Sequence, residues 1–263
     1  MDYVAFDLDG TLVGRETRLS DRVRSSVAAM LAQGTSGGIV TGRMFQAARP
    51  FVRELRLSAP TICYQGAWVV DTATQRRLLD RPIAPDLVGE ILAAFNTADC
   101  HLQLYSDDRY YCERSNRFSE LYASLAGVAP VIGPLGERFL HRSATKAVVI
   151  ADPERAAEIE LSARSLFGER LYITRSYPEF VEMLDPGVDK GTALAFVAQH
   201  LGVSMDRVLA IGDSWNDLPI LRQAGIGVAM GNAPPEVRAC ADAVVGTVAE
   251  DGVCEALERF VLR

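Results

Sequence analysis

Strand and helix patterns alternate in two separated parts of the chain, up to about residue 80 and again from about residue 185. In the first part, a short apolar run before Asp7 predicts a buried strand, and Ser20 can cap a helix that ends near residue 33. Residues 37–43 and 61–64 predict two further strands with their turns. Such alternation is typical of an α/β domain with a mostly parallel sheet covered by helices.

The segment from Phe45 to Leu55 also has a helical pattern, but Pro50 lies inside it. Because proline lacks an N–H and its ring clashes with the preceding turn, we expect an interruption there. In the second part of the chain, from about residue 185, strands and helices again alternate. The predicted strands are 208–211, 226–230 and 243–245, and the predicted helices are 191–200, 218–223, 235–240 and 253–260.

The middle of the chain has a different pattern. Residues 101–105 and 110–112 flank a polar turn, and residues 171–174 and 180–184 form a second predicted hairpin. A strand at 146–150 and a helix at 153–167 lie between the hairpins. We therefore expect two domains, with an α+β module at 81–184 inserted into an α/β core made of 1–80 and 185–263.

Composition excludes several classes of protein. The 263 residues are 49% apolar and 23% charged, which is ordinary for a soluble protein, and the net charge of −7 argues against nucleic acid or an anionic membrane as partner. The five cysteines are scattered and form no C-x-x-C pair, so neither a zinc site nor a disulfide framework is expected. The chain enters its first strand directly and has no run of 18 apolar residues, so we expect a cytoplasmic protein. The sequence does not predict its oligomeric state.

Two aspartates follow the first strand, in the order Asp7-Leu8-Asp9-Gly10-Thr11. At ~4 Å and an effective dielectric constant of ~20, two like charges repel by about 4 kcal/mol. Such a pair requires a cation, a proton or a function. The alternative is a turn rich in aspartate that merely ends the strand.

Three other polar segments are predicted at strand ends or at a helix start. They are Thr41-Gly42-Arg43, Lys190, and the run from Gly212 to Asp217. Ligands of open α/β sheets bind at the carboxyl ends of the strands, where these segments would meet. Taken singly, each has a plainer interpretation, namely a turn, a solvated lysine or a helix cap.

Together the segments supply two sets of groups. Carboxylates around one point would suit an oxygen-liganded ion such as Mg²⁺, and they come from Asp7, Asp9 and Asp213. Donors and positive charge would suit a phosphate, and they come from Thr41, the Gly42 amide, Lys190 and Asn216.

The order of these motifs resembles the phosphatases of the haloacid dehalogenase (HAD) superfamily. The later segments Val228–Ala233 and Glu250–Val253 are similar to the Cof-type branch, class IIB, in which a large α+β cap is inserted between the second and third motifs. The resemblance extends along the whole chain. It implies a Rossmann-like HAD core with a mostly parallel sheet, and an inserted α+β cap at 81–184 that sets substrate specificity.

The resemblance also implies a role for each motif residue. Asp7 would be the nucleophile that forms an aspartyl-phosphate, and Asp9 the general acid and then the base. Mg²⁺ would be held by Asp7, the backbone carbonyl of Asp9 and Asp213, with Asp217 acting through water or through another ligand. The groups implied to hold the phosphoryl oxygens are the Leu8 backbone, Thr41, Gly42, Lys190 and Asn216.

Two residues depart from the usual pattern of the family. Gln65 stands where Asn is common, which keeps the amide on a longer arm, and Trp215 stands where a small residue is usual. The expected function is a Mg²⁺-dependent phosphatase of small phosphorylated metabolites, with sugar phosphates among the candidates. A phosphomutase of the same superfamily and a non-catalytic metabolite-binding protein on the same fold remain the alternatives.

Overall fold

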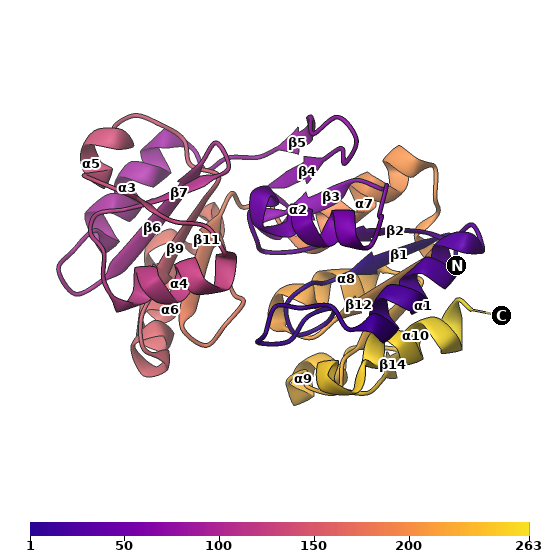
Figure 1. Ribbon diagram of the computed structural model, residues 1–263. Helices are drawn as coiled ribbons and strands as arrows, with labels where there is room; N and C mark the ends of the chain where they lie inside the picture. The colour runs from indigo at the N-terminus through magenta and orange to yellow at the C-terminus, as the bar shows by residue number, and fades with distance from the viewer. Residues whose placement is uncertain (263) are drawn as a thin grey trace. The chain divides into compact units, whose positions relative to one another are not determined.

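The computed structural model describes residues 1–262 and divides into two compact units. Residues 1–79 and the chain from Asp189 onward form the first unit, and residues 80–188 form the second. The chain thus leaves the first unit once and returns to it once (Figure 1). We refer to the units as the core and the cap.

A five-stranded sheet forms the centre of the core. Its strands are all parallel and lie in the order β14-β13-β12-β1-β2, with bounds β1 Tyr3–Phe6, β2 Ser36–Ile39, β12 Val208–Gly212, β13 Ile226–Ala229 and β14 Ala243–Val244. Ala5 of β1 pairs with Ala210 on one side and with Gly38 on the other. Because every strand runs in the same direction, all their carboxyl ends meet at one edge.

Alternate residues of β1 enter different hydrophobic clusters. Val4 and Phe6 pack with α1 (Asp21–Ala32) and α10 (Gly252–Phe260), which contact each other. Tyr3 and Ala5 pack instead with α7 (Lys190–Leu201) and α8 (Leu218–Gln223). Since side chains alternate along a strand, the sheet is covered by helices on both faces (Figure 1), as the near-continuous apolar strands require.

The prediction of an interrupted helix at Pro50 is wrong. Helix α2 runs from Phe45 to Glu54 with Pro50 inside it. Phe45, before the proline in the chain, and Phe51, after it, are both buried, so their packing on the core offsets the lost hydrogen bond. The remaining short elements of the core are β3 Thr61–Cys63, β4 Trp68–Val70, β5 Arg77–Asp80, α9 Pro235–Arg238 and the 3₁₀ turns η1 Tyr64–Gly66, η3 Met205–Arg207, η4 Trp215–Asp217 and η5 Val248–Glu250.

The cap contains a mixed six-stranded sheet in the order β10-β11-β9-β6-β7-β8. The bounds are β6 His101–Ser106, β7 Arg109–Cys112, β8 Val131–Ile132, β9 Lys146–Ile150, β10 Tyr172–Arg175 and β11 Phe180–Leu184. Its helices are α3 Pro85–Phe95, α4 Arg117–Ala126, α5 Leu135–Arg138 and α6 Pro153–Phe167, followed by the 3₁₀ turn η2 Gly168–Arg170. Both predicted hairpins are confirmed, whereas α3 and α4 were not predicted.

The turn of the β6–β7 hairpin explains its register. Asp107 and Asp108 both have positive φ, at 52° and 56°. Two consecutive residues of this kind give the turn whose twist matches that of an antiparallel pair, and aspartate tolerates it better than most residues. Among residues 1–262, no helix is long and apolar enough to cross a membrane.

Candidate active site

The predicted motifs meet at the carboxyl edge of the core sheet. Asp7 follows β1, and its N–H donates to the Ile211 carbonyl of β12 at 2.9 Å. Thr41 follows β2, and its N–H donates to the Ile62 carbonyl at 2.9 Å. Parallel pairing therefore places the ends of β1, β2 and β12 side by side.

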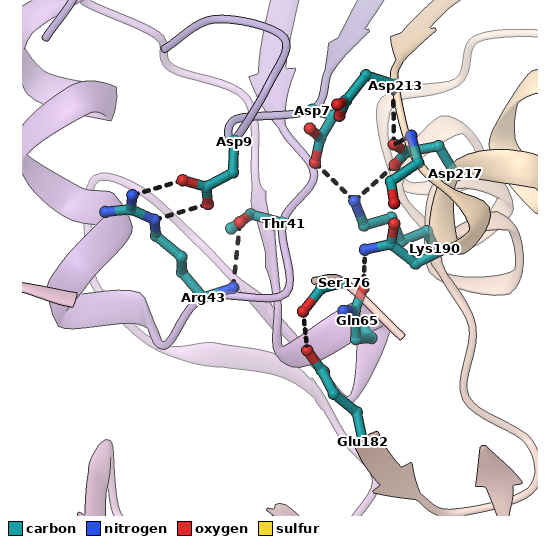
Figure 2. Close-up of polar contacts among 12 residues, drawn as sticks. Asp7, Asp9, Thr41, Arg43, Gln65, Ser176, Glu182, Lys190, Asp213 and Asp217 are labelled. Atoms are coloured by element: carbon teal, nitrogen blue, oxygen red, sulfur yellow. Dashed lines mark hydrogen bonds and ion pairs between the residues drawn. The ribbon is translucent and has the colours of Figure 1, made fainter. Parts of the chain in front are cut away.

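Lys190 joins two of the aspartates. Its Nζ donates to Asp7 Oδ1 and to Asp217 Oδ1, each at 2.6 Å (Figure 2). All three side chains are almost completely buried. Lys190 is the first residue of α7, where Asp189 and Thr192 form a capping box that fixes the start of the helix. The helix thus aims a buried ammonium at the carboxylates.

Asp217 holds the loop after β12. Its Oδ2 accepts from the N–H groups of Asp213 and Ser214, at 2.9 Å and 3.0 Å. Because Oδ1 accepts from Lys190, both oxygens already have protein donors. This arrangement suits a residue that positions Asp213 better than one that ligates an ion directly.

Asn232 holds the side chain of Asp213. Its Nδ2 donates to Asp213 Oδ2 and to the Gly10 carbonyl, both at 3.0 Å. A Cβ on Gly10, which has φ +84°, would lie 2.1 Å from Asp213 Oδ2, so only glycine permits this approach. Sequence reasoning had assigned Asn232 no role in the site, although its segment carried the family resemblance.

The buried carboxylates outnumber the nearby cations. Burial raises the pKa of Asp7 to about 7, and the charge of Asp217 adds to the rise while Lys190 opposes it. Burial and then Asp7 raise the pKa of Asp213 to about 9. Burial alone would lower the pKa of Lys190, but Asp217 and Asp7 outweigh it and raise that pKa. The site therefore favours binding of further positive charge.

The donor set fits a divalent cation. Carboxylate oxygens of Asp7, Asp213 and Asp217 lie within 4.8 Å of one another. Asp213 Oδ1 is buried and has no hydrogen-bond partner among residues 1–262. Such an oxygen is costly unless something binds it, and oxygen ligands are those that Mg²⁺ prefers.

The carboxylate of Asp9 lies apart from this cluster. Arg43 Nε donates to Asp9 Oδ2 at 2.7 Å, and Arg43 Nη2 donates to Oδ1 at 2.5 Å (Figure 2). This bidentate pair is partly buried. The Asp9 carboxylate, which the sequence predicted beside those of Asp7 and Asp213, is instead paired with Arg43, a residue for which no role had been predicted. The backbone carbonyl of Asp9 stays a predicted metal ligand.

The predicted phosphate-binding residues lie around the same edge. Thr41 is buried, and its Oγ1 accepts from the Arg43 N–H at 3.1 Å. Asn216 is buried, and its Nδ2 donates to Gln65 Oε1 at 2.9 Å. The carbonyl of Leu8 accepts from the N–H groups of Leu12 and Val13, which closes the turn after β1.

Trp215 is held at its polar edge. Its indole Nε1 donates to Glu236 Oε1 at 2.7 Å, while 38% of the residue remains exposed. The hydrogen bond fixes the ring, and the exposed part shows that Trp215 is not a core residue. The indole therefore lies on the surface beside the Asp213–Asp217 loop.

Comparison with known proteins identifies the family. Residues 4–257 match the family of haloacid dehalogenase-like hydrolases. The chain belongs to this family. The 5-amino-6-(5-phospho-D-ribitylamino)uracil phosphatase YcsE of Bacillus subtilis is 30% identical over 98% of the chain and 95% of the relative. An HMP-PP phosphatase of Cronobacter sakazakii is 26% identical over 89% of the chain and 86% of the relative.

A solved HAD subclass IIB sugar phosphatase has the same fold. It is 24% identical, its TM-score is 0.87, and the alignment covers 100% of both chains. The predicted fold class, a Rossmann-like HAD core with an inserted α+β cap, is confirmed. The prediction of a Cof-type phosphatase is also confirmed, so the chain is a phosphoric monoester hydrolase.

Proposed function

We propose that the protein is a Mg²⁺-dependent phosphatase that hydrolyses small phosphorylated metabolites through a phosphoryl group carried on Asp7. The observation that supports this most is the cluster of carboxylates of Asp7, Asp213 and Asp217, whose oxygens lie within 4.8 Å of one another and which contains one buried ammonium, that of Lys190, paired with Asp7 and Asp217. A purely structural cluster would have no need for an excess of buried negative charge.

The proposed ion would be held by Asp7, Asp213 and the backbone carbonyl of Asp9. When bound, Mg²⁺ would offset the repulsion between an anionic nucleophile and an anionic phosphate. Lys190 contributes a fixed positive charge from the protein itself. Asp217 keeps Lys190 and the Asp213 backbone in place through its two oxygens.

The chemistry divides into two displacements at phosphorus. In the first, an oxygen of Asp7 bonds to phosphorus as the bond to the leaving oxygen breaks, and Asp9 gives that oxygen a proton. In the second, Asp9 takes a proton from water, whose oxygen bonds to phosphorus as the Asp7–phosphorus bond breaks. The products are the alcohol and inorganic phosphate, and Asp7 and Asp9 return to their starting states.

The pair between Arg43 and Asp9 fixes the orientation of the proposed acid. Arg43 donates to both oxygens of Asp9 and uses one acceptor site on each. The remaining acceptor sites, or a rotation of either side chain, would let Asp9 face the leaving oxygen and then the water.

The relatives and the cap support small phosphorylated metabolites as substrates. YcsE and the HMP-PP phosphatase are named for small phosphorylated compounds, and both align with most of this chain. The cap has a buried ion pair on one face of its sheet, between Lys146 and Glu182 at 3.1 Å, where a purely structural sheet would bury apolar groups. We propose that the cap, including this pair, selects the non-phosphate part of the substrate.

A panel of phosphate monoesters tests the function. The wild-type protein with Mg²⁺ should release inorganic phosphate over many turnovers, and Asp7→Asn should release none. Multiple turnovers distinguish hydrolysis from a phosphomutase, which returns the phosphoryl group to a sugar. Binding of phosphorylated metabolites with no turnover of any of them would instead favour the non-catalytic alternative.

A further inference from the structure

Gln65 is buried in a strained turn of the core. The residue is fully buried, and its φ of 59° lies in the left-handed region, as does the φ of 51° of Tyr64. Non-glycine residues adopt this conformation at a cost, so two in succession persist only where the surroundings require them. The turn is pinned by two hydrogen bonds to the Thr41–Arg43 segment, from the Gln65 N–H to the Thr41 carbonyl at 3.1 Å and from the Tyr64 N–H to the Arg43 carbonyl at 3.0 Å.

The side chain of Gln65 reaches across to a second segment of the site. Its Oε1 accepts from Asn216 Nδ2 at 2.9 Å, and the bond is buried. Figure 2 shows Gln65 beside Lys190. An amide nitrogen carries two hydrogens, so this bond uses one and fixes the direction of the other. Asn216 Oδ1 is buried and has no hydrogen-bond partner among residues 1–262, so Gln65 is what sets the orientation of this amide.

The same side chain lies against the turn that follows β2. A Cβ on Gly42 would lie 2.4 Å from Gln65 Nε2, so any other residue there would displace the Gln65 amide. Next to Gln65, a Cβ on Gly66 would lie 2.4 Å from the carbonyl of Asp189. Asp189 is the residue that caps the N-terminus of α7, the helix that begins with Lys190. The turn at Gln65 thus contacts the segments that contain Thr41, Lys190 and Asn216.

We infer that Gln65 is a positioning residue that orients Asn216 and couples it to the Thr41–Gly42 turn for binding of the phosphoryl group. The inference rests on the proposed phosphatase function and deepens it. Gln65 acts through Asn216, because its acceptor oxygen is already bonded to that side chain. The glutamine is therefore a specific requirement of this chain and not a neutral replacement of the asparagine that is common at this position.

The length of the side chain makes this claim testable. Asparagine is shorter than glutamine by one C–C bond, about 1.5 Å. A 2.9 Å contact lengthened by even half of that falls outside hydrogen-bond range, which ends near ~3.5 Å. Gln65→Asn keeps an amide but loses the reach to Asn216. Gln65→Met keeps the length but loses the amide.

The experiment measures the affinity of the Mg²⁺-loaded protein for inorganic phosphate by calorimetry, together with kcat and KM for an aryl phosphate. Loss of one buried hydrogen bond typically weakens binding ~5- to 30-fold, and both Gln65 variants should show this. KM should rise by a similar factor, whereas kcat should change less, as expected for loss of binding common to substrate and transition state. Gln103→Met is the matched control, because Gln103 is equally buried and hydrogen-bonded but lies in the cap; it should leave phosphate affinity unchanged.

A double-mutant cycle with Asn216→Ala separates positioning from general stability. In the Asn216→Ala background, Gln65→Met should weaken phosphate binding less than ~2-fold further. If Gln65→Met acted only by destabilising the fold, its full effect on phosphate affinity would add to that of Asn216→Ala. Unchanged phosphate affinity in Gln65→Met and Gln65→Asn would overturn the inference, as would a full additional effect in the Asn216→Ala background. If the wild type neither binds phosphate nor hydrolyses any monoester, the proposed function itself is wrong.

Discussion

Replacing Lys190 with methionine should reveal how strongly the buried carboxylates depend on its charge. The substitution keeps an unbranched apolar side chain but removes the ammonium and its two 2.6 Å contacts with Asp7 and Asp217. Breaking a buried ion pair by removing one partner costs about 3–5 kcal/mol, because the other charge stays buried. In a protein of this size each kcal/mol lowers the melting temperature by roughly 2–4 °C, so the fall should be roughly 6–20 °C.

Thermal unfolding of the metal-free protein provides the assay for Lys190→Met, with phosphate release measured in parallel. Adding Asp217→Asn should recover part of the lost stability, because the variant neutralises one of the two unpaired carboxylates. The double variant should remain inactive, because the fixed cation is still missing. A melting temperature of Lys190→Met equal to that of the wild type would refute the reasoning, as would a further loss of stability in the double variant.

Three further predictions concern metal, acid–base chemistry and specificity. EDTA should abolish turnover and Mg²⁺ restore it. Because the pKa values of Asp7 (about 7) and Asp213 (about 9) lie above the ~3.9 of an unfolded aspartate, the metal-free protein should lose stability as pH rises, by up to ~1.4 kcal/mol per pH unit for each group. Both groups contribute to this slope from about pH 4 to about pH 7 and only Asp213 from there to about pH 9, and Mg²⁺ should flatten the slope in melting experiments. Asp9→Asn should slow single-turnover formation and hydrolysis of the phospho-enzyme by ~10²–10⁴-fold, and wild-type rates would contradict the assignment. Glu182→Gln in the cap should change kcat/KM for natural substrates, and their ranking, more than it changes kcat/KM for a small aryl phosphate. A parallel fall of kcat/KM for both substrate types would exclude a role of Glu182 in specificity.

The sequence predicted the arrangement of the core well because its signals are local. A buried strand directly before Asp7, and a helix that starts at Lys190, each follow from short apolar patterns and their end signals. Parallel strands then bring the ends together without further information. The helix over 45–55 was predicted, but its continuity through Pro50 was not, because packing of residues before and after the proline overrides a local rule.

The partners within the site could not be predicted in the same way. Arg43 and Asp9 are 34 residues apart, and Gln65 and Asn216 are 151 apart, so no periodicity connects them. Their contacts depend on the reach of individual side chains once the backbone is in place. The unusual glutamine was nevertheless visible in the sequence, as a departure from the common pattern of the family.

The central claim, that Asp7 carries the phosphoryl group, is tested most directly by trapping the intermediate. Asp9→Asn should be mixed with Mg²⁺ and a reactive phosphate donor such as acetyl phosphate, quenched in acid and digested for mass spectrometry. We predict that the mass of one phosphoryl group is added to the peptide that contains Asp7, and that Asp7→Asn abolishes this addition. A label on any other residue would contradict the account, as would turnover by the wild type without a label on Asp7 under any quench condition.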